Sequence, residues 1–129
     1  MSSLQLPARK YFATGFFFLA LAVLIGAFGA HGLKAIVTAE KLVTFETGVR
    51  YHFFHGFGIV IVAFMQKLFP EMKLSAAFYA FLVGIILFSF NCYFYVLSGM
   101  KVFAMIVPVG GLLFVMGWIV LLWKSLKLR

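Results

Sequence analysis

The sequence predicts an all-α integral membrane protein: a four-helix bundle of up-down-up-down topology, in one domain over residues 1–129. Two observations predict this fold. First, 65% of the residues are hydrophobic and 11% are charged, whereas a typical soluble domain is about half apolar and about a quarter charged. Second, the apolar residues form four long runs with basic residues at their ends. Lipid must therefore be the solvent, and the chain has no room for an appended soluble catalytic module.

The expected membrane spans are the four apolar runs, at about 11–33, 51–69, 74–97 and 102–123. Each run meets the need for about 20 residues to cross about 30 Å of hydrocarbon. Arg9 and Lys10 precede the first run, as basic residues precede the apolar core of a signal peptide. That core is usually only about 7–15 residues long. We therefore expect the first run to be a retained helix.

The longest connection, 34–50, is not obviously a loop. Thr38 is a suitable N-cap for a helix that starts after it. Glu46 and Arg50 form an i,i+4 pair in the favourable order. A helix from Ala39 to Phe69 would be about 46 Å long, more than the hydrocarbon needs. The segment is either an amphipathic extension of the second span or a helix that bends near Gly48 and lies along the interface.

The basic residues predict the orientation of the bundle. Four spans with short connections are antiparallel neighbours, so both termini lie on one side. The terminal side carries Arg9, Lys10, Lys67, Lys73, Lys124, Lys127 and Arg129, and the other side carries Lys34, Lys41, Arg50 and Lys101. The positive-inside rule then predicts that both termini are cytoplasmic.

Charge and cysteine content exclude several classes of function. The formal net charge is +8, but the basic residues flank apolar runs as membrane anchors do, so we expect no nucleic-acid partner. The single cysteine, Cys92, excludes an intramolecular disulfide and a cysteine-based zinc site.

Small residues in the first and last spans predict close helix packing. They are Ala22, Gly26, Gly29 and Ala30 in the first span and Gly110, Gly111 and Gly117 in the last. Such residues let helix backbones approach closely in lipid. Pro108 leaves the carbonyl of Ala104 without its donor, so we expect a kink or local opening there. Packing is the default interpretation; the alternative is that the freed carbonyl and nearby glycines line a cavity.

Polar side chains gather towards the outer ends of the first three spans, and such groups in hydrocarbon predict a functional site by default. At 100° per residue, Tyr51, His52 and His55 share a broad stripe on the second helix, whereas Glu46 and Arg50 fall on the opposite side. Because neighbouring spans run antiparallel, we expect the histidines and the outer end of the third span to lie at similar depth in the membrane. The candidate pocket residues are His31, Tyr51, His52, His55, Ser89, Asn91 and Tyr95, with Tyr93 nearby.

Three interpretations of this polar layer remain open: two kinds of ligand site and a purely structural role. Histidines from two helices could ligate haem iron or a transition metal. No carboxylate lies inside a span to complete a usual metal set, and no haem attachment motif occurs, so we expect no metal and no cofactor. Tyrosine and histidine could instead bind the polar part of a quinone or lipid in an apolar pocket. The third possibility is ordinary hydrogen bonding between helices.

Catalysis and transport have little support in the sequence. It contains no legible Ser–His–acid or Cys–His constellation and no P-loop or Rossmann motif. Glu46 could pair with His52 or His55 in acid–base catalysis, but it projects away from the histidine stripe. No charged residue lies deep in a span to mark an ion path. We therefore expect no catalytic residue.

Several motifs together resemble the YgdD/YwdK-like family of small four-span bacterial inner-membrane proteins, a domain of unknown function with small eukaryotic transmembrane relatives. The matching stretches are Gly26-Ala27-Phe28-Gly29-Ala30-His31, Thr47-Gly48-Val49-Arg50-Tyr51-His52-Phe53-Phe54-His55, Leu87-Phe88-Ser89 with Tyr93, and Val107-Pro108-Val109-Gly110-Gly111 with Gly117-Trp118. His52 stands where the family pattern has glutamine. The resemblance implies a multi-pass inner-membrane protein and supplies no activity or substrate.

The first functional hypothesis is a structural or interaction role, through packing with membrane lipids and other membrane proteins. The second is a binding module for a lipid, a quinone or, less readily, haem in the outward pocket. A membrane enzyme or transporter comes third. The small-residue face also leaves open a homo-oligomer or a membrane-protein partner.

Overall fold

The computed structural model describes residues 6–128, and within them it is entirely helical apart from short connections. The elements are α1 (Leu6–His31), the short 3-10 turn η2 (Leu33–Ala35), α2 (Ala39–Leu68), α3 (Ser75–Ile85), the π-helical segment η3 (Ile86–Phe90), α4 (Asn91–Ser98) and α5 (Lys101–Ser125). Because α3, η3 and α4 run on as one helix, residues 6–128 contain four helices long and apolar enough to span a membrane. The predicted all-α, four-span fold is confirmed.

Local sequence signals set several helix ends. The Thr38 hydroxyl accepts a hydrogen bond from the Lys41 backbone N–H (3.4 Å), so Thr38 is the predicted N-cap. Helix α2 then continues without a break to Leu68, shortly before Pro70. The segment before the second span is therefore part of one long helix. At the C-terminal end of α4, Gly99 adopts a left-handed backbone conformation (φ 72°) that ends the helix.

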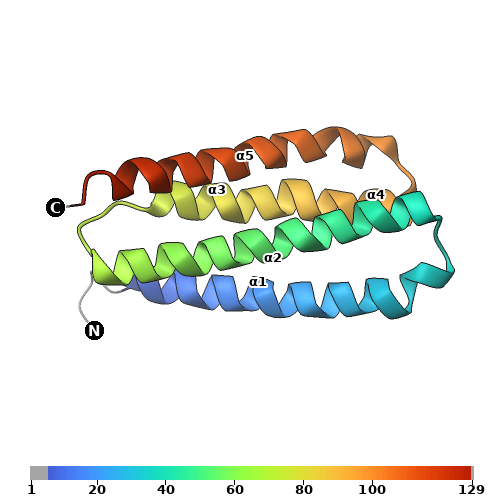
Figure 1. Ribbon diagram of the computed structural model, residues 1–129, viewed down its shortest axis with the longest axis horizontal. Coiled ribbons are helices and arrows are strands. Elements are labelled where there is room, and N and C mark those ends of the chain that lie inside the picture. Colours follow the sequence, from blue (N-terminus) through green and yellow to red (C-terminus); the bar gives the residue numbers. More distant parts are fainter. Residues whose placement is uncertain (1–5, 129) are drawn as a thin grey trace.

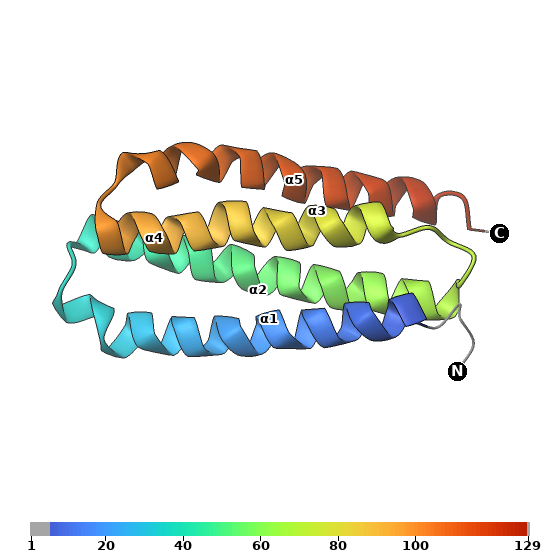
Figure 2. The same cartoon turned by 180° about the vertical axis from the view of Figure 1, so that it is seen from behind.

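The helices form an antiparallel bundle with two outer and two inner members. Helix α1 packs along α2, α5 packs along α3 and α4, and the two pairs join where α2 meets the α3–α4 helix. In both ribbon views α1 and α5 lie at opposite edges (Figures 1 and 2). The start of α1 and the end of α5 lie at the same end of the bundle. The outer helices are therefore left with broad surfaces for lipid.

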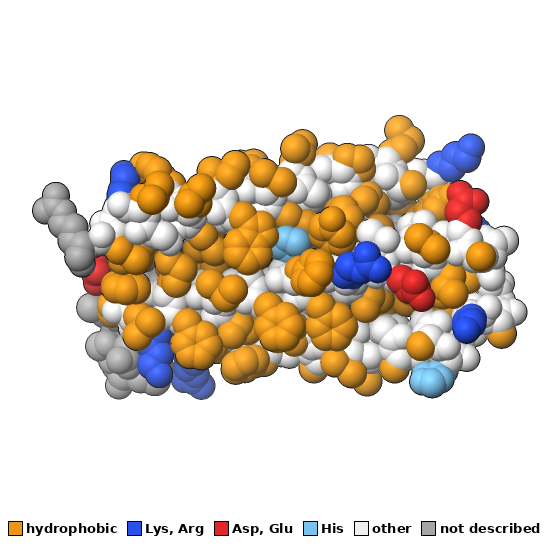
Figure 3. Space-filling view, in the orientation of Figure 1, with side chains coloured by type: hydrophobic (Ala, Val, Ile, Leu, Met, Phe, Trp, Pro, Cys, Tyr) orange, Lys and Arg blue, Asp and Glu red, His pale blue; other side chains and the backbone are white. Residues whose placement is uncertain are grey.

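Two aromatic-rich clusters fill the interior. The larger one lies towards the terminal end of the bundle, where Tyr11 of α1 stacks on Phe78 of α3 with ring centroids 4.1 Å apart. The smaller one joins Leu33, Phe45, Tyr93 and Val96. Apart from one basic and one acidic side chain, the face seen in Figure 3 is mostly apolar between its charged ends, as expected for a protein dissolved in hydrocarbon.

Glycines allow the closest contacts between helices, in line with the packing interpretation. A Cβ atom on Gly29 of α1 would lie 2.5 Å from the Phe45 ring of α2, and one on Gly117 of α5 would lie 2.5 Å from the Phe81 ring of α3. Ala22 is fully buried, whereas Ala30 is exposed. Most of the small-residue face of α1 is thus used within the bundle.

Irregular backbone occurs at a place that the sequence did not indicate. The kink or opening was expected at Pro108, and α5 continues as helix through that residue. The π-helical segment lies instead on the neighbouring helix, at Ile86–Phe90. The two places touch, because a Cβ atom on Gly110 would lie 2.4 Å from the backbone nitrogen of Phe88.

Candidate functional site

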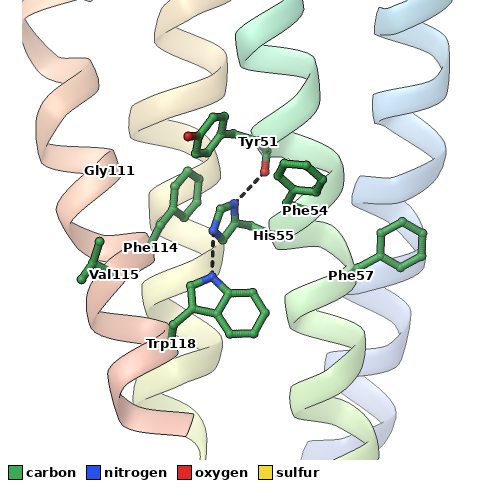
Figure 4. Close-up of a pocket in the computed structure, with 8 residues that line it drawn as sticks. All are labelled: Tyr51, Phe54, His55, Phe57, Gly111, Phe114, Val115 and Trp118. Atoms are coloured by element: carbon green, nitrogen blue, oxygen red, sulfur yellow. Dashed lines mark hydrogen bonds between the residues drawn. The ribbon is translucent and has the colours of Figure 1, made fainter. Parts of the chain in front are cut away.

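The structure distributes the predicted pocket residues over several environments. His31 is exposed at the end of α1, away from the other two histidines. His52 and His55 lie near the middle of α2 and are buried. Ser89 and Asn91 are buried on the α3–α4 helix, and Tyr95 is half-buried on α4. His55 and Tyr51 border a groove between α2 and α5, which is the best-defined candidate site (Figure 4).

His55 is held in one orientation by hydrogen bonds at both ring nitrogens. Its Nδ1 lies 2.8 Å from the backbone oxygen of Tyr51, and its Nε2 lies 3.1 Å from Nε1 of Trp118. A carbonyl oxygen can only accept and an indole N–H can only donate. His55 is therefore the neutral tautomer that carries its proton on Nδ1. Its ring also stacks on Phe114, with centroids 3.4 Å apart and planes 6° apart.

The groove itself is apolar and opens towards the lipid. Its cavity measures about 500 Å³, within the range of about 300–1,000 Å³ usual for ligand sites. The lining residues are Tyr51, Phe54, His55 and Phe57 from α2 and Gly111, Phe114, Val115 and Trp118 from α5. Phe54, Phe57 and Val115 are each 55% exposed. The His55–Trp118 pair thus forms a small polar feature beside a slot of hydrocarbon character.

A second histidine joins α2 to the α3–α4 helix. His52 is fully buried, and its Nδ1 lies 3.0 Å from the hydroxyl of Tyr93. Its ring lies between Phe18 of α1 and Phe90 of η3, with both centroid distances 5.7 Å. Within residues 6–128, its Nε2 and the hydroxyl of Ser89 are the buried side-chain atoms without a hydrogen-bond partner, although the Phe18 backbone approaches the ring. The hydrogen bond between His52 and Tyr93 therefore holds α2 against the α3–α4 helix inside the bundle.

Asn91 and Tyr95 have different surroundings from the histidines. The Asn91 amide donates to the backbone oxygens of Ile86 (3.2 Å) and Leu87 (3.0 Å), so it fastens the π-helical segment. Tyr95 borders a second hollow of about 320 Å³ between α2, α4 and α5, which Ala104 also lines. Asn91 is therefore engaged by its own helix.

Sequence reasoning did not select Phe114 and Trp118, although they complete the contacts of His55. A signal was present: Gly111, Phe114 and Trp118 follow the i, i+3, i+7 spacing of one helix face. An indole N–H at membrane depth also needs an acceptor. With almost every neighbour apolar, the spacing alone did not distinguish this face of α5 from the others.

The titratable side chains give no metal centre in the described part of the chain. Between residues 6 and 128, no three or more His, Cys, Asp or Glu side chains are close enough together to hold a metal ion.

Comparison with known proteins decides the family. The model of a family described as "Protein of unknown function (DUF423)" matches residues 25–111. This chain belongs to the DUF423 family. The matched region contains all seven candidate pocket residues, and it ends at Gly111, before Phe114 and Trp118.

Curated relatives of the DUF423 family match over most of their length. The UPF0382 membrane protein YwdK of Bacillus subtilis is 36% identical over 83% of this chain and 88% of its own. A UPF0382 membrane protein of Haemophilus influenzae is 38% identical over 88% of each chain. The UPF0382 inner membrane protein YgdD of Escherichia coli is 35% identical over 90% of this chain and 86% of its own. No solved structure matches this chain.

These relatives confirm the predicted resemblance and the membrane environment. None of the three names states an activity, and the family is described as one of unknown function.

Proposed function

We propose that this member of the DUF423 family is a non-catalytic membrane protein that binds lipid, holding one acyl chain in the groove between α2 and α5. The observation that carries the proposal is the groove: about 500 Å³, lined almost wholly by aromatic and aliphatic side chains, and open sideways. An acyl chain is the occupant that such a surface meets in a bilayer. Burying apolar area against fixed aromatic rings favours a bound chain through close packing.

The state of His55 supports binding in preference to catalysis. Both ring nitrogens are occupied by fixed partners, and the ring is clamped against Phe114. A general base needs a nitrogen within hydrogen-bond reach of the proton that it takes up. His55 would have to give up the Trp118 bond to act in this way. Its role in the proposal is to hold Trp118, and hence one wall of the groove, in place.

The proposal includes an orientation of the bundle in the membrane and does not commit to a protein partner. We propose cytoplasmic termini because seven basic residues flank that side of the sequence and four flank the other. The groove would then lie near the middle of the bilayer, since His55 is near the middle of α2. Association with a second copy or another membrane protein stays a prediction, and the exposed apolar surfaces of α1 and α5 are the faces available for it.

Native mass spectrometry with defined phospholipids tests the groove directly. Val115 lines the groove and is 55% exposed, so Val115→Phe should fill the slot without disturbing the core. We expect lipid occupancy at a fixed lipid concentration to fall about threefold or more, as for a loss of about 0.7 kcal/mol or more. The matched control is Val109→Phe, on the same helix, 50% exposed and outside the groove.

The control should retain wild-type occupancy. Equal lipid occupancy in Val115→Phe, Val109→Phe and the wild type would mean that the groove holds no particular chain, and the proposal would be wrong. Circular dichroism of both variants should show the wild-type helix content, since each change adds apolar volume at an exposed position.

A further inference from the structure

Two opposite charges lie on the lipid-facing side of α2. Glu46 and Arg50 are both exposed and one helical turn apart. Both border a small hollow of about 170 Å³ between α1 and α2, which Gly26, Gly29 and Ala30 of α1 also line. The space-filling view shows a basic and an acidic side chain together within an apolar face, whereas the other charges gather at the ends (Figure 3).

The depth of this pair differs from that of the charges at the helix ends. From Lys67 to Arg50, α2 rises about 25 Å, whereas α5 rises about 35 Å from Lys124 to Lys101. The terminal ends of these helices lie together (Figure 1), so Arg50 is about 10 Å nearer the bilayer centre than Lys101. With about 30 Å of hydrocarbon above Lys67, the Arg50 backbone lies about 5 Å inside the hydrocarbon boundary. The long arginine side chain spans that distance and reaches the phospholipid phosphates.

The charges of Glu46 and Arg50 determine which kind of lipid headgroup would bind beside them. Arg50 presents planar donors that suit a phosphate, and Glu46 offers oxygens that accept from an ammonium group. A headgroup that carries only negative charge would gain one attraction and meet one repulsion. A headgroup with both a phosphate and a primary ammonium gains two attractions. An ion pair within the helix would use only some of the five donors of Arg50.

We propose that Glu46 and Arg50 form a headgroup site for phosphatidylethanolamine, with the headgroup seated over the Gly26–Gly29–Ala30 hollow. This inference rests on the proposed lipid-binding function and names the lipid class. Phe54 and Phe57 follow Arg50 at i+4 and i+7, so they lie on its side of α2, and both line the groove between α2 and α5 where it opens. A headgroup at Arg50 therefore places an acyl chain beside Phe54 and Phe57.

The test compares phosphatidylethanolamine with phosphatidylglycerol, which carries the phosphate without the ammonium. Each lipid is titrated into detergent-purified protein and read by native mass spectrometry. The wild type should prefer phosphatidylethanolamine about threefold to fivefold, the upper part of the range for an exposed charge pair. Glu46→Gln should bring the ratio close to one, and Arg50→Gln should weaken binding of both lipids.

Two controls match these variants in charge and exposure. Glu40→Gln removes an exposed acid from the first turn of the same helix, and Lys34→Gln removes an exposed base at the same end of the bundle. Both should keep the wild-type ratio. An equal response to the two lipids in the wild type would overturn the proposal, as would an unchanged ratio in Glu46→Gln. Unchanged binding in Arg50→Gln would do the same.

Together, the Val115→Phe and Glu46→Gln variants distinguish the headgroup site from the groove. If Val115→Phe lowers occupancy of both lipids while the ratio holds, the groove and the headgroup site both stand. If Val115→Phe has no effect and Glu46→Gln still abolishes the preference, the groove proposal fails and the headgroup site stands. If the preference is absent and Val115→Phe still reduces occupancy, only the headgroup site fails.

Discussion

At the scale of single residues, the bilayer makes hydrogen-bond partners decisive. His55 and Trp118 lie where water is scarce, and each satisfies a polar group of the other (3.1 Å). The two bonds of His55 fix its tautomer, because Nδ1–H donates to the Tyr51 carbonyl and Nε2 accepts from Trp118. His52 is satisfied at Nδ1 by Tyr93. The histidines therefore connect helices that are far apart in sequence.

A double-mutant cycle measures the His55–Trp118 bond. His55→Phe should keep the stack on Phe114 and lose both ring nitrogens, and Trp118→Phe should keep an aromatic ring and lose the donor. We expect a coupling energy of about 0.6 kcal/mol, with about 1.7 kcal/mol as the upper end, as for hydrogen bonds between membrane helices. Reversible unfolding in mixed micelles gives the four free energies. The control cycle pairs His55→Phe with Trp123→Phe, at an exposed position, and should show no coupling.

A coupling energy of zero in the first cycle would contradict the assigned bond. The stack would then be the main contact between His55 and α5.

At the scale of elements, the π-helical segment is fitted to α5. The extra backbone width of η3 lies against Gly110, where no Cβ intervenes, and the Asn91 amide fastens the carbonyls of Ile86 and Leu87. Segments of this kind commonly occur at functional sites. Here the segment turns Phe88 towards Tyr51 and Phe114, with ring centroids 4.7 and 5.4 Å apart. The groove wall therefore depends on this irregular turn.

Adjacent glycines on α5 should respond differently to alanine. A Cβ atom on Gly110 would lie 2.4 Å from the Phe88 nitrogen, which the backbone cannot easily relieve, so Gly110→Ala should destabilise by about 1–3 kcal/mol. A Cβ atom on Gly111 would meet the Phe88 ring at 3.7 Å, an ordinary contact. Gly111→Ala should therefore be within about 0.5 kcal/mol of the wild type. Unfolding in mixed micelles compares the two, and similar losses would show that the α5–η3 contact is looser than described.

At the scale of the whole molecule, the bundle is open at its sides. Helices α1 and α5 lie at opposite edges, so α2 and the α3–α4 helix carry most of the packing. This arrangement leaves the space between α2 and α5 to side chains that meet across the groove (Figure 4). Lipid therefore has access to side chains near the middle of the bundle without passing through its ends.

Cysteine labelling tests the proposed orientation of this bundle. The native Cys92 is buried, so replacing it with alanine gives a background with little reactivity of its own. Lys34→Cys and Lys127→Cys then place exposed thiols at opposite ends. In intact cells, a membrane-impermeant maleimide should label position 34 at once and position 127 only after permeabilisation. The reverse pattern would place the termini outside.

Much of the architecture could be predicted from the sequence. Local features predicted the four spans and the N-cap at Thr38, since caps and apolar runs act over a few residues. The sequence left open whether the segment before Arg50 continues the second span or bends near Gly48, and the structure shows that it continues. The helical stripe also placed His52 and His55 on the buried side of α2 and Glu46 on the exposed side. The groove could not be predicted in the same way, because almost every neighbour of Trp118 on α5 is apolar and the spacing did not distinguish its face of the helix from the others.

By itself, the sequence determined that this protein is a membrane-spanning bundle of four helices, because hydropathy over about 20 residues decides what crosses a bilayer. Only the tertiary structure decided which faces meet. In water, a buried face differs from an exposed one in polarity; in lipid both are apolar, so periodicity does not mark the interior. The pairing of His55 with Trp118, 63 residues away, and the register of η3 against Gly110 follow from side-chain shape. That shape acts only once the helices are packed together.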